Sequence, residues 1–275
     1  MTSAPPIRWK FSIDPNYSWF GSFADDFRSP DVTFIPEYED DRPTWYWFSS
    51  RHFTELDDPS EVRDRACALK AILDGAFYLN YSPVRNEIFH PFGLGELFST
   101  SESGGPDVPQ VGGLTSPNVL VAPFSSTWSS WVADWESFGN PFRRFESAML
   151  WLSRTDATVL GMLQFLGVNG PTWITLYGLM DFMRTAGVGF KDMAQIGGTS
   201  QAEIGRFTGT ANNFAAIGPF CRHGDQGNTP PKNPMLLAEA QVLVLRIARA
   251  FLVDRLNSTG LPRTYKPKAR FVDDD

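Results

Sequence analysis

The hydrophobic periodicity of this chain changes near Asn140–Pro141, and this change constrains the fold more than any single motif does. Before this point, apolar residues alternate with polar ones, as in the run from Ile7 to Ile13, which is typical of a half-buried strand. After it, apolar residues recur every three or four positions in successive segments, which is typical of amphipathic helices. The sequence therefore predicts an α+β protein, with a strand-rich N-terminal domain followed by an α-helical bundle.

Short strands and one main helix are predicted before the change. The strands cover residues 7–13, 32–36 and 44–48, and the last two flank an acidic turn and should pair as a hairpin. The main helix covers residues 60–76. Residues 84–98 and 117–124 have the composition of further extended segments, with a Gly-, Ser- and Pro-rich loop over residues 99–113 between them. The tryptophans between 128 and 135 have the spacing of a short helix.

Aromatic residues are concentrated in the first half, and four of them follow one another from Trp45 to Phe48. Alternation along a strand places Trp45 and Trp47 on one face and Tyr46 and Phe48 on the other. One pair therefore belongs to the core. The other pair could stack on bases or sugars, although the acidic run that precedes it would repel a nucleic acid.

The second half is predicted to be helical almost throughout. The expected helices cover residues 142–152, 159–166, 173–184, 201–216 and 234–257. The domain organisation that follows is a strand-rich sensing or gating domain over residues 1–137, a helical bundle over residues 138–260 and a loose tail over residues 261–275.

The charge of the chain is unevenly divided. The net charge is −7, but residues 1–137 carry 9 Lys and Arg against 20 Asp and Glu (9 − 20 = −11), whereas residues 138–275 carry 15 against 11 (15 − 11 = +4). This asymmetry favours either a C-terminal surface that faces a polyanion or an internal match between the two halves. With two distant cysteines, no signal-peptide run and no apolar stretch of membrane-spanning length, a soluble cytoplasmic protein is expected.

Polar residues gather between Thr208 and Glu239, where a loop leads into the last predicted helix. This span holds one of the three histidines, together with Asn212, Asn213, Cys221, Arg222, His223, Asp225 and Asn233. Such a junction combines rigid support with access to solvent. The chain has no nucleophile elbow, Walker loop, dinucleotide-binding fingerprint or H-E-x-x-H motif, and its Cys and His residues form no zinc pattern, so no metal or cofactor is predicted.

This C-terminal span resembles a group of uncharacterised bacterial proteins with a T-A-N … R-H-[AG] … P-P-K-N-P-M signature. The matching residues are Thr210-Ala211-Asn212, Arg222-His223-Gly224 and Pro230 to Met235. The order of helices is also similar to a degenerate HEPN bundle, as in several abortive-infection proteins, although here the arginine adjoins the histidine instead of preceding it by several residues. The resemblance implies a bacterial defence-type or regulatory protein whose bundle engages RNA or a nucleotide.

If the protein is an enzyme, the resemblance implies a metal-independent endoribonuclease. His223 would move the proton because imidazole titrates near neutral pH, Arg222 would hold the phosphate, and Asn212 would orient the ring or the substrate. Further contacts to RNA would come from Lys232, Arg206 and Asn213.

Two alternatives stay open. In the structural interpretation, Asn212 caps a helix or bonds a loop carbonyl, and Arg222 and His223 tie the loop to the bundle. The rival function is a non-catalytic interaction or assembly module. HEPN-type bundles often pair face to face, so a homodimer is expected under either view.

A second motif, Arg85 to His90, matches the R-N-x-x-x-H pattern of HEPN ribonucleases. Its flanking prolines and its alternating apolar residues predict an extended segment, which would turn Arg85 and His90 to opposite faces. We therefore interpret the match as a coincidence.

Overall fold

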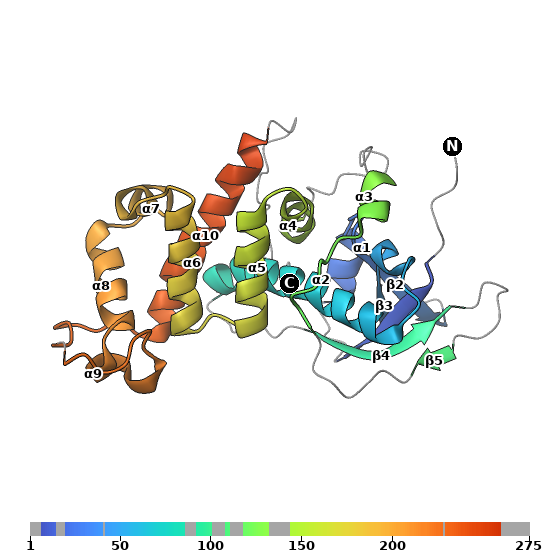
Figure 1. Cartoon of the computed structure of the whole chain (residues 1–275), viewed down its shortest axis with the longest axis horizontal. Coiled ribbons are helices and arrows are strands. Elements are labelled where there is room, and N and C mark those ends of the chain that lie inside the picture. Colours follow the sequence, from blue (N-terminus) through green and yellow to red (C-terminus); the bar gives the residue numbers. More distant parts are fainter. Residues whose placement is uncertain are drawn as a thin grey trace. The chain divides into compact units, whose positions relative to one another are not determined.

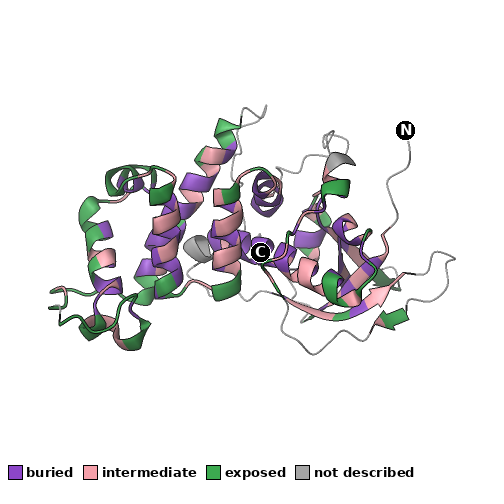
Figure 2. Cartoon of the chain, in the orientation of Figure 1, coloured by how far each residue is buried: buried purple, intermediate pink, exposed green. Residues whose placement is uncertain are grey.

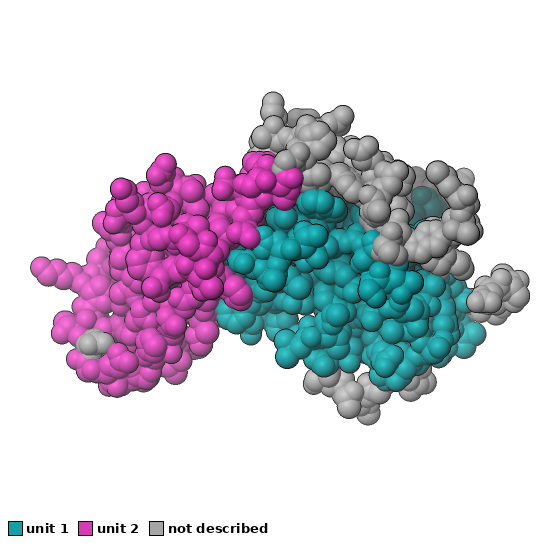
Figure 3. All heavy atoms as spheres, turned by 45° about the horizontal axis from the view of Figure 1, so that its top comes forward, with its two compact units in different colours: residues 1–78, 87–170 teal, residues 79–86, 171–275 magenta. Residues whose placement is uncertain are grey.

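The computed structural model of the chain describes residues 7–14, 20–40, 42–85, 92–100, 108–110, 118–131, 144–227 and 229–259. Strands come first along the chain and helices dominate later, so the predicted α+β class is confirmed. The chain divides into two compact units, which Figure 3 shows in different colours. Unit 1 comprises residues 1–78 and 87–170, and unit 2 comprises residues 79–86 and 171–275.

Unit 1 contains an antiparallel sheet of five strands among the described residues, in the order β2-β3-β1-β4-β5 (Figure 1). The strands are β1 (Trp9–Asp14), β2 (Thr33–Glu39), β3 (Arg42–Ser49), β4 (Gly93–Ser99) and β5 (Val108–Gln110). β2 pairs with β3 in the predicted hairpin, with Phe34 opposite Phe48. The predicted strands before residue 50 correspond to β1, β2 and β3, because one face of the sheet is buried. β4 lies almost entirely within the predicted extended segment over residues 84–98, whereas β5 lies where a loop was predicted.

The buried face packs against α1 (Phe20–Asp26) and α2 (Pro59–Arg85), where purple residues concentrate in Figure 2. Aromatic rings from the sheet and from both helices fill this core. Phe20 lies 5.1 Å from Phe34, and Phe23 lies 4.9 Å from Phe77, measured between ring centroids. Edge-to-face and tilted arrangements of this kind add to the hydrophobic gain from burial.

Unit 1 also includes η1 (Arg51–Phe53), α3 (Ser126–Trp131), α4 (Phe145–Ser153) and α5 (Ala157–Asn169). The backbones of α2 and α5 approach closely at two glycines. A Cβ on Gly75 would lie 2.2 Å from the Leu163 carbonyl oxygen, and one on Gly167 would lie 1.9 Å from that of Ala71. The sequence predicted a domain boundary at residue 137, whereas α4 and α5 are grouped with the sheet in unit 1, which extends to residue 170. The close approach of α5 to α2 accounts for this grouping.

All described elements of unit 2 are helical, and they include the C-terminal end of α2. The others are α6 (Trp173–Thr185), α7 (Phe190–Ile196), α8 (Gln201–Ala211), α9 (Phe214–Ile217), η4 (Gly218–Phe220) and α10 (Leu237–Ser258). α10 packs against α6 and α7, and α6 packs against α8. Their shared core contains Leu176, Met180, Phe207, Val244 and Ile247, all fully or almost fully buried.

Several sequence-based element predictions are wrong. α2 continues to Arg85, so residues 84 and 85 are helical and not extended. Residues 118–124 form turns and bends in place of a strand. There the Asn118 side chain accepts the Leu120 N–H at 3.1 Å, and such local bonds compete with strand pairing. The expected helix over 201–216 is two helices, α8 and α9, and the short α1 and α7 were not predicted.

Candidate functional site

The Arg222–His223 dipeptide begins a long loop, residues 221–236, that joins η4 to α10. Two groups near the end of α8 hold the ends of this loop. The Arg222 N–H donates to the Ala211 carbonyl at 3.0 Å, and the Met235 N–H donates to the Thr210 hydroxyl at 3.0 Å. A loop of this length without secondary structure needs such bonds to keep one conformation.

Arg206, a predicted RNA contact, also supports this loop. Its guanidinium donates to the carbonyl of Asn233 at 3.0 Å and to that of Pro234 at 3.3 Å. It also donates to Glu239 at 2.9 Å. The Glu239 carboxylate caps α10 by accepting the Leu236 N–H. This hydrogen bond and the one from Arg206 lower the pKa of Glu239. Arg206 therefore holds the C-terminal end of the loop in place through hydrogen bonds.

Arg222 is oriented by two residues of α6. Its Nη2 lies 3.0 Å from the Asp181 carboxylate, and its guanidinium carbon lies 4.3 Å from the centroid of the Tyr177 ring. Tyr177 in turn contacts Phe207, which stacks on Trp173. The Arg222 side chain nevertheless keeps 38 % of its surface exposed. The guanidinium is thus held in a defined plane with donors still facing solvent.

The remaining predicted site residues have different environments. His223 and Lys232 are exposed on the loop, so the imidazole has the access to solvent that was expected where a loop meets a helix. Asn212 is half-buried at the end of α8, and its buried Oδ1 has no hydrogen-bond partner in the described structure. Asn213 is buried, and its Oδ1 accepts the Ala216 N–H at 3.0 Å, which caps α9.

All of the predicted site residues therefore lie on α8, beside its end or on the loop bonded to it. Exposed apolar side chains, which sequence reasoning missed, lie in the same stretch of the chain. Phe220 is 67 % exposed, Phe214 40 % and Leu236 70 %. Their positions between Asn212 and the start of α10 were visible in the sequence, but no periodic pattern there indicated whether these residues would be buried or exposed.

The Arg85 to His90 motif is only partly described. Arg85 is the last residue of α2, and residues 86–91 lie outside the described residues. The interpretation of this motif as a coincidence stays a prediction, although its expected extended backbone is wrong at Arg85.

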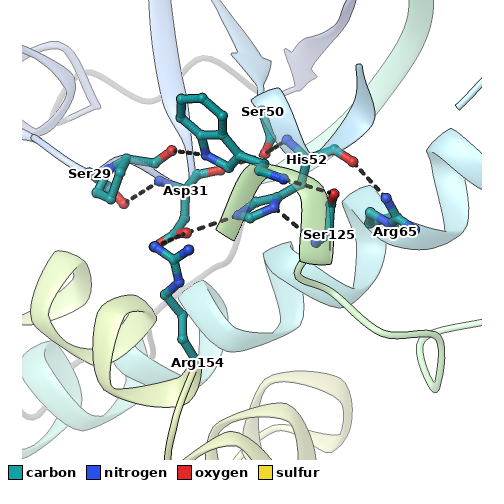
Figure 4. A network of polar contacts seen from close by, with 9 residues as sticks. Ser29, Asp31, Ser50, His52, Arg65, Ser125 and Arg154 are labelled. Atoms are coloured by element: carbon teal, nitrogen blue, oxygen red, sulfur yellow. Dashed lines mark hydrogen bonds and ion pairs between the residues drawn. The ribbon is translucent and has the colours of Figure 1, made fainter. Parts of the chain in front are cut away.

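Sequence reasoning also missed a buried polar network in unit 1, shown in Figure 4. Asp31, which precedes β2, and His52 in η1 are both fully buried. The His52 Nε2 lies 2.9 Å from one carboxylate oxygen of Asp31, and Arg154 lies 3.2 Å from the same oxygen. Ser50 donates to the Asp31 carbonyl, and Arg65 donates to the His52 carbonyl at 2.7 Å.

This network has the residue types of a catalytic site but a structural geometry. The His52 Nδ1 accepts a hydrogen bond from the backbone N–H of Ser125 at 3.0 Å. The ring proton is therefore on Nε2, which donates a hydrogen bond to the Asp31 carboxylate. Burial lowers the pKa of His52, against the opposing effect of Asp31, so the imidazole is neutral at neutral pH. Asp31 and His52 have no exposed surface, so the cluster serves to join segments at β2, η1, α3 and the end of α4.

Other kinds of site find no support in the described part of the chain. No group of three or more His, Cys, Asp or Glu side chains among these residues could hold a metal ion. None of the helices in the described ranges is long and apolar enough to cross a membrane. No protein-family model, curated protein or solved structure matches the chain. The resemblance to the signature-bearing bacterial group therefore stays a prediction.

Proposed function

We propose that unit 2 binds single-stranded RNA through the surface formed by α9, η4 and the 221–236 loop, as a regulatory or defence-type protein would. The observation that supports this proposal is that one stretch of the chain carries both exposed aromatic rings and exposed cationic side chains. Phe214 of α9 and Phe220 of η4 are exposed, and so are Arg222, His223 and Lys232 on the loop that follows them. Single-stranded nucleic acids are bound by surfaces on which bases stack and Lys or Arg side chains follow the backbone.

The charge of unit 2 supports a modest, salt-dependent interaction. Residues 171–259 carry eight Lys and Arg against six Asp and Glu (8 − 6 = +2), in contrast to −11 for residues 1–137. Arg206 and Arg222 are each paired with a carboxylate, which reduces their contribution to phosphate binding. Base stacking on the phenylalanines would then supply much of the affinity.

Cleavage of RNA is a separate question. The loop offers one imidazole, that of His223, and the guanidinium beside it is already shared with Asp181. General acid–base cleavage needs proton transfer at both the attacking and the leaving oxygen, so we propose binding alone and treat ribonuclease activity as an outcome of the test.

A non-catalytic interaction module is the second candidate. Leu236 and Leu237 are 70 % and 38 % exposed, and aliphatic side chains provide no stacking surface for bases. These two leucines favour a protein partner, including a second copy of this chain.

The test measures the binding of a fluorescent oligouridine to the full chain in EDTA, across a salt series. Phe220→Ala should weaken binding about fivefold or more, because stacking contributes about 1–3 kcal/mol per base. Lys232→Ala should weaken binding and make it less salt-dependent. Phe190→Ala and Lys191→Ala on α7, which are exposed residues of the same types, serve as matched controls and should leave binding unchanged.

The outcomes separate the candidates. Equal losses in the loop and α7 variants would refute the proposed site. The interaction module would be favoured if the protein does not bind RNA but forms oligomers, and if Leu236→Ser disrupts these oligomers. Degradation of the oligonucleotide in EDTA that His223→Ala abolishes would add ribonuclease activity to binding.

A further inference from the structure

The outer face of the sheet in unit 1, which points away from the phenylalanine core, carries an aromatic surface. On β3, Trp45 and Trp47 share this face, whereas Tyr46 and Phe48 are buried, so the two pairs lie on opposite faces as alternation predicted. Phe98 of β4 pairs with Lys10 of β1 and lies on the same face. β4 is mostly of intermediate burial, as its colour in Figure 2 shows. The rings of Trp47 and Phe98 meet edge to face at 5.2 Å. Trp45 keeps 37 % of its surface exposed.

One cation already lies on this surface. The Lys10 ammonium of β1 lies 4.1 Å from the centroid of a Trp47 ring. A cation over the face of an indole is attracted by the electron-rich ring. The contact shows that the geometry of this face accommodates an ammonium group against tryptophan.

Carboxylates dominate the charge around the rings. Asp14 and Glu96 are exposed, and their strand positions place them on the same face as Lys10 and Phe98. Glu37 lies opposite Trp45 in the β2–β3 register and accepts the Trp47 indole N–H at 2.7 Å. An aromatic surface bordered by acids attracts cations and repels phosphates.

We propose that this face, defined by Trp45, Trp47, Phe98, Glu37 and Glu96, binds an extended, arginine- or lysine-bearing segment of a partner protein. Residues two apart on a strand lie roughly 7 Å from each other on one face. The spacing of Trp45 and Trp47 therefore matches cations at alternate positions of an extended peptide. One such cation would stack on Trp45, a second would take the place of Lys10 on Trp47, and the carboxylates would pair with both.

The experiment uses the full chain and a fluorescent peptide in which arginine alternates with serine, with binding followed by anisotropy. Trp45→Ala should weaken binding about three- to fivefold, the loss expected for one exposed cation–π contact. Glu96→Gln should weaken it less and reduce its salt dependence. Lys10→Ala should strengthen binding, because it removes a like charge and uncovers the Trp47 ring.

The Lys10 variant gives the decisive sign, because a surface for RNA or an acidic peptide would lose affinity when a lysine is removed. Phe190→Ala, which removes an exposed ring in unit 2 outside both proposed surfaces, is the matched control and should leave peptide binding unchanged. Far-UV circular dichroism confirms that each variant is folded. A wild-type chain that does not bind the arginine peptide, or binds a glutamate–serine peptide equally well, overturns the proposal. So does unchanged affinity in Trp45→Ala or weaker affinity in Lys10→Ala.

Discussion

Asp74 should give this protein an unusual dependence of stability on pH. The residue lies on α2, is almost fully buried and bonds to the Lys70 ammonium at 2.5 Å. Its other carboxylate oxygen, Oδ1, is buried without a hydrogen-bond partner. Burial raises the pKa of Asp74 from 3.8 to about 6, because the cost of desolvation exceeds the attraction of Lys70.

The direction in which stability changes with pH follows from the linkage between proton binding and folding. The folded protein binds this proton more tightly than the unfolded chain, so the stabilising contribution is complete below pH 3.8 and is lost as the pH rises through about 6. With 1.36 kcal/mol for each factor of ten in proton affinity, the full difference is about 3 kcal/mol. Between pH 4 and pH 7 the same relation gives about 2.4 kcal/mol.

The measurement compares the wild type with Asp74→Asn, which cannot ionise, by denaturant unfolding at pH 4 and pH 7. The free energy of unfolding of the wild type, relative to that of the variant, should be about 2.4 kcal/mol larger at pH 4 than at pH 7, so that the wild type gains stability on acidification. Other titrating groups cancel in this double difference. Glu61→Gln, an exposed position on the same helix, should show no such change. A relative stability that stays constant, or falls on acidification, would refute the argument that burial dominates at Asp74.

Three further substitutions test the packing and the polar contacts. Gly167→Ala should lower the free energy of unfolding by about 2 kcal/mol or more, because its Cβ would lie 1.9 Å from the Ala71 carbonyl oxygen; unchanged denaturant stability would contradict this close approach. Asp31→Ala should cost about 3–5 kcal/mol, because it leaves the buried His52 N–H and the largely buried Arg154 guanidinium without their carboxylate, and a loss under 1 kcal/mol in the same unfolding assay would argue against a structural role. Asn213→Ala should cost about 1 kcal/mol through loss of the α9 cap, whereas Asn213→Asp should retain most of the stability.

Local patterns in the sequence predict most of the elements. Alternation around Phe34 and Phe48 fixes the β2–β3 hairpin because a strand with one buried face has a period of two. The division into units is not local. It depends on the approach of Gly75 and Gly167, which are far apart in sequence, and a glycine inside a helical pattern can signal either an end or a close contact.

The candidate site was only partly predictable for the same reason. Sequence motifs indicate Arg222 and His223, but nothing local shows that Asp181 and Tyr177, on a separate helix, orient the arginine. Arg206 could not be distinguished from a surface cation, because its carbonyl partners belong to the loop that it supports. The Asp31 network likewise joins segments that only the tertiary fold brings together.

The two proposed surfaces make opposite demands on their ligands, and this contrast can resolve the charge asymmetry of the sequence. In the two proposals, the outer face of the sheet binds cations and the 221–236 loop binds anions. If each surface faces solvent independently, added salt should weaken both the arginine peptide and the RNA from the lowest ionic strength upward. If instead the acidic half docks on the basic half, low salt would hold both surfaces covered. Moderate salt would then release them, and both affinities would first rise before screening lowers them. A monotonic loss for both probes would therefore exclude the internal match, whereas a shared maximum at intermediate salt would reveal it.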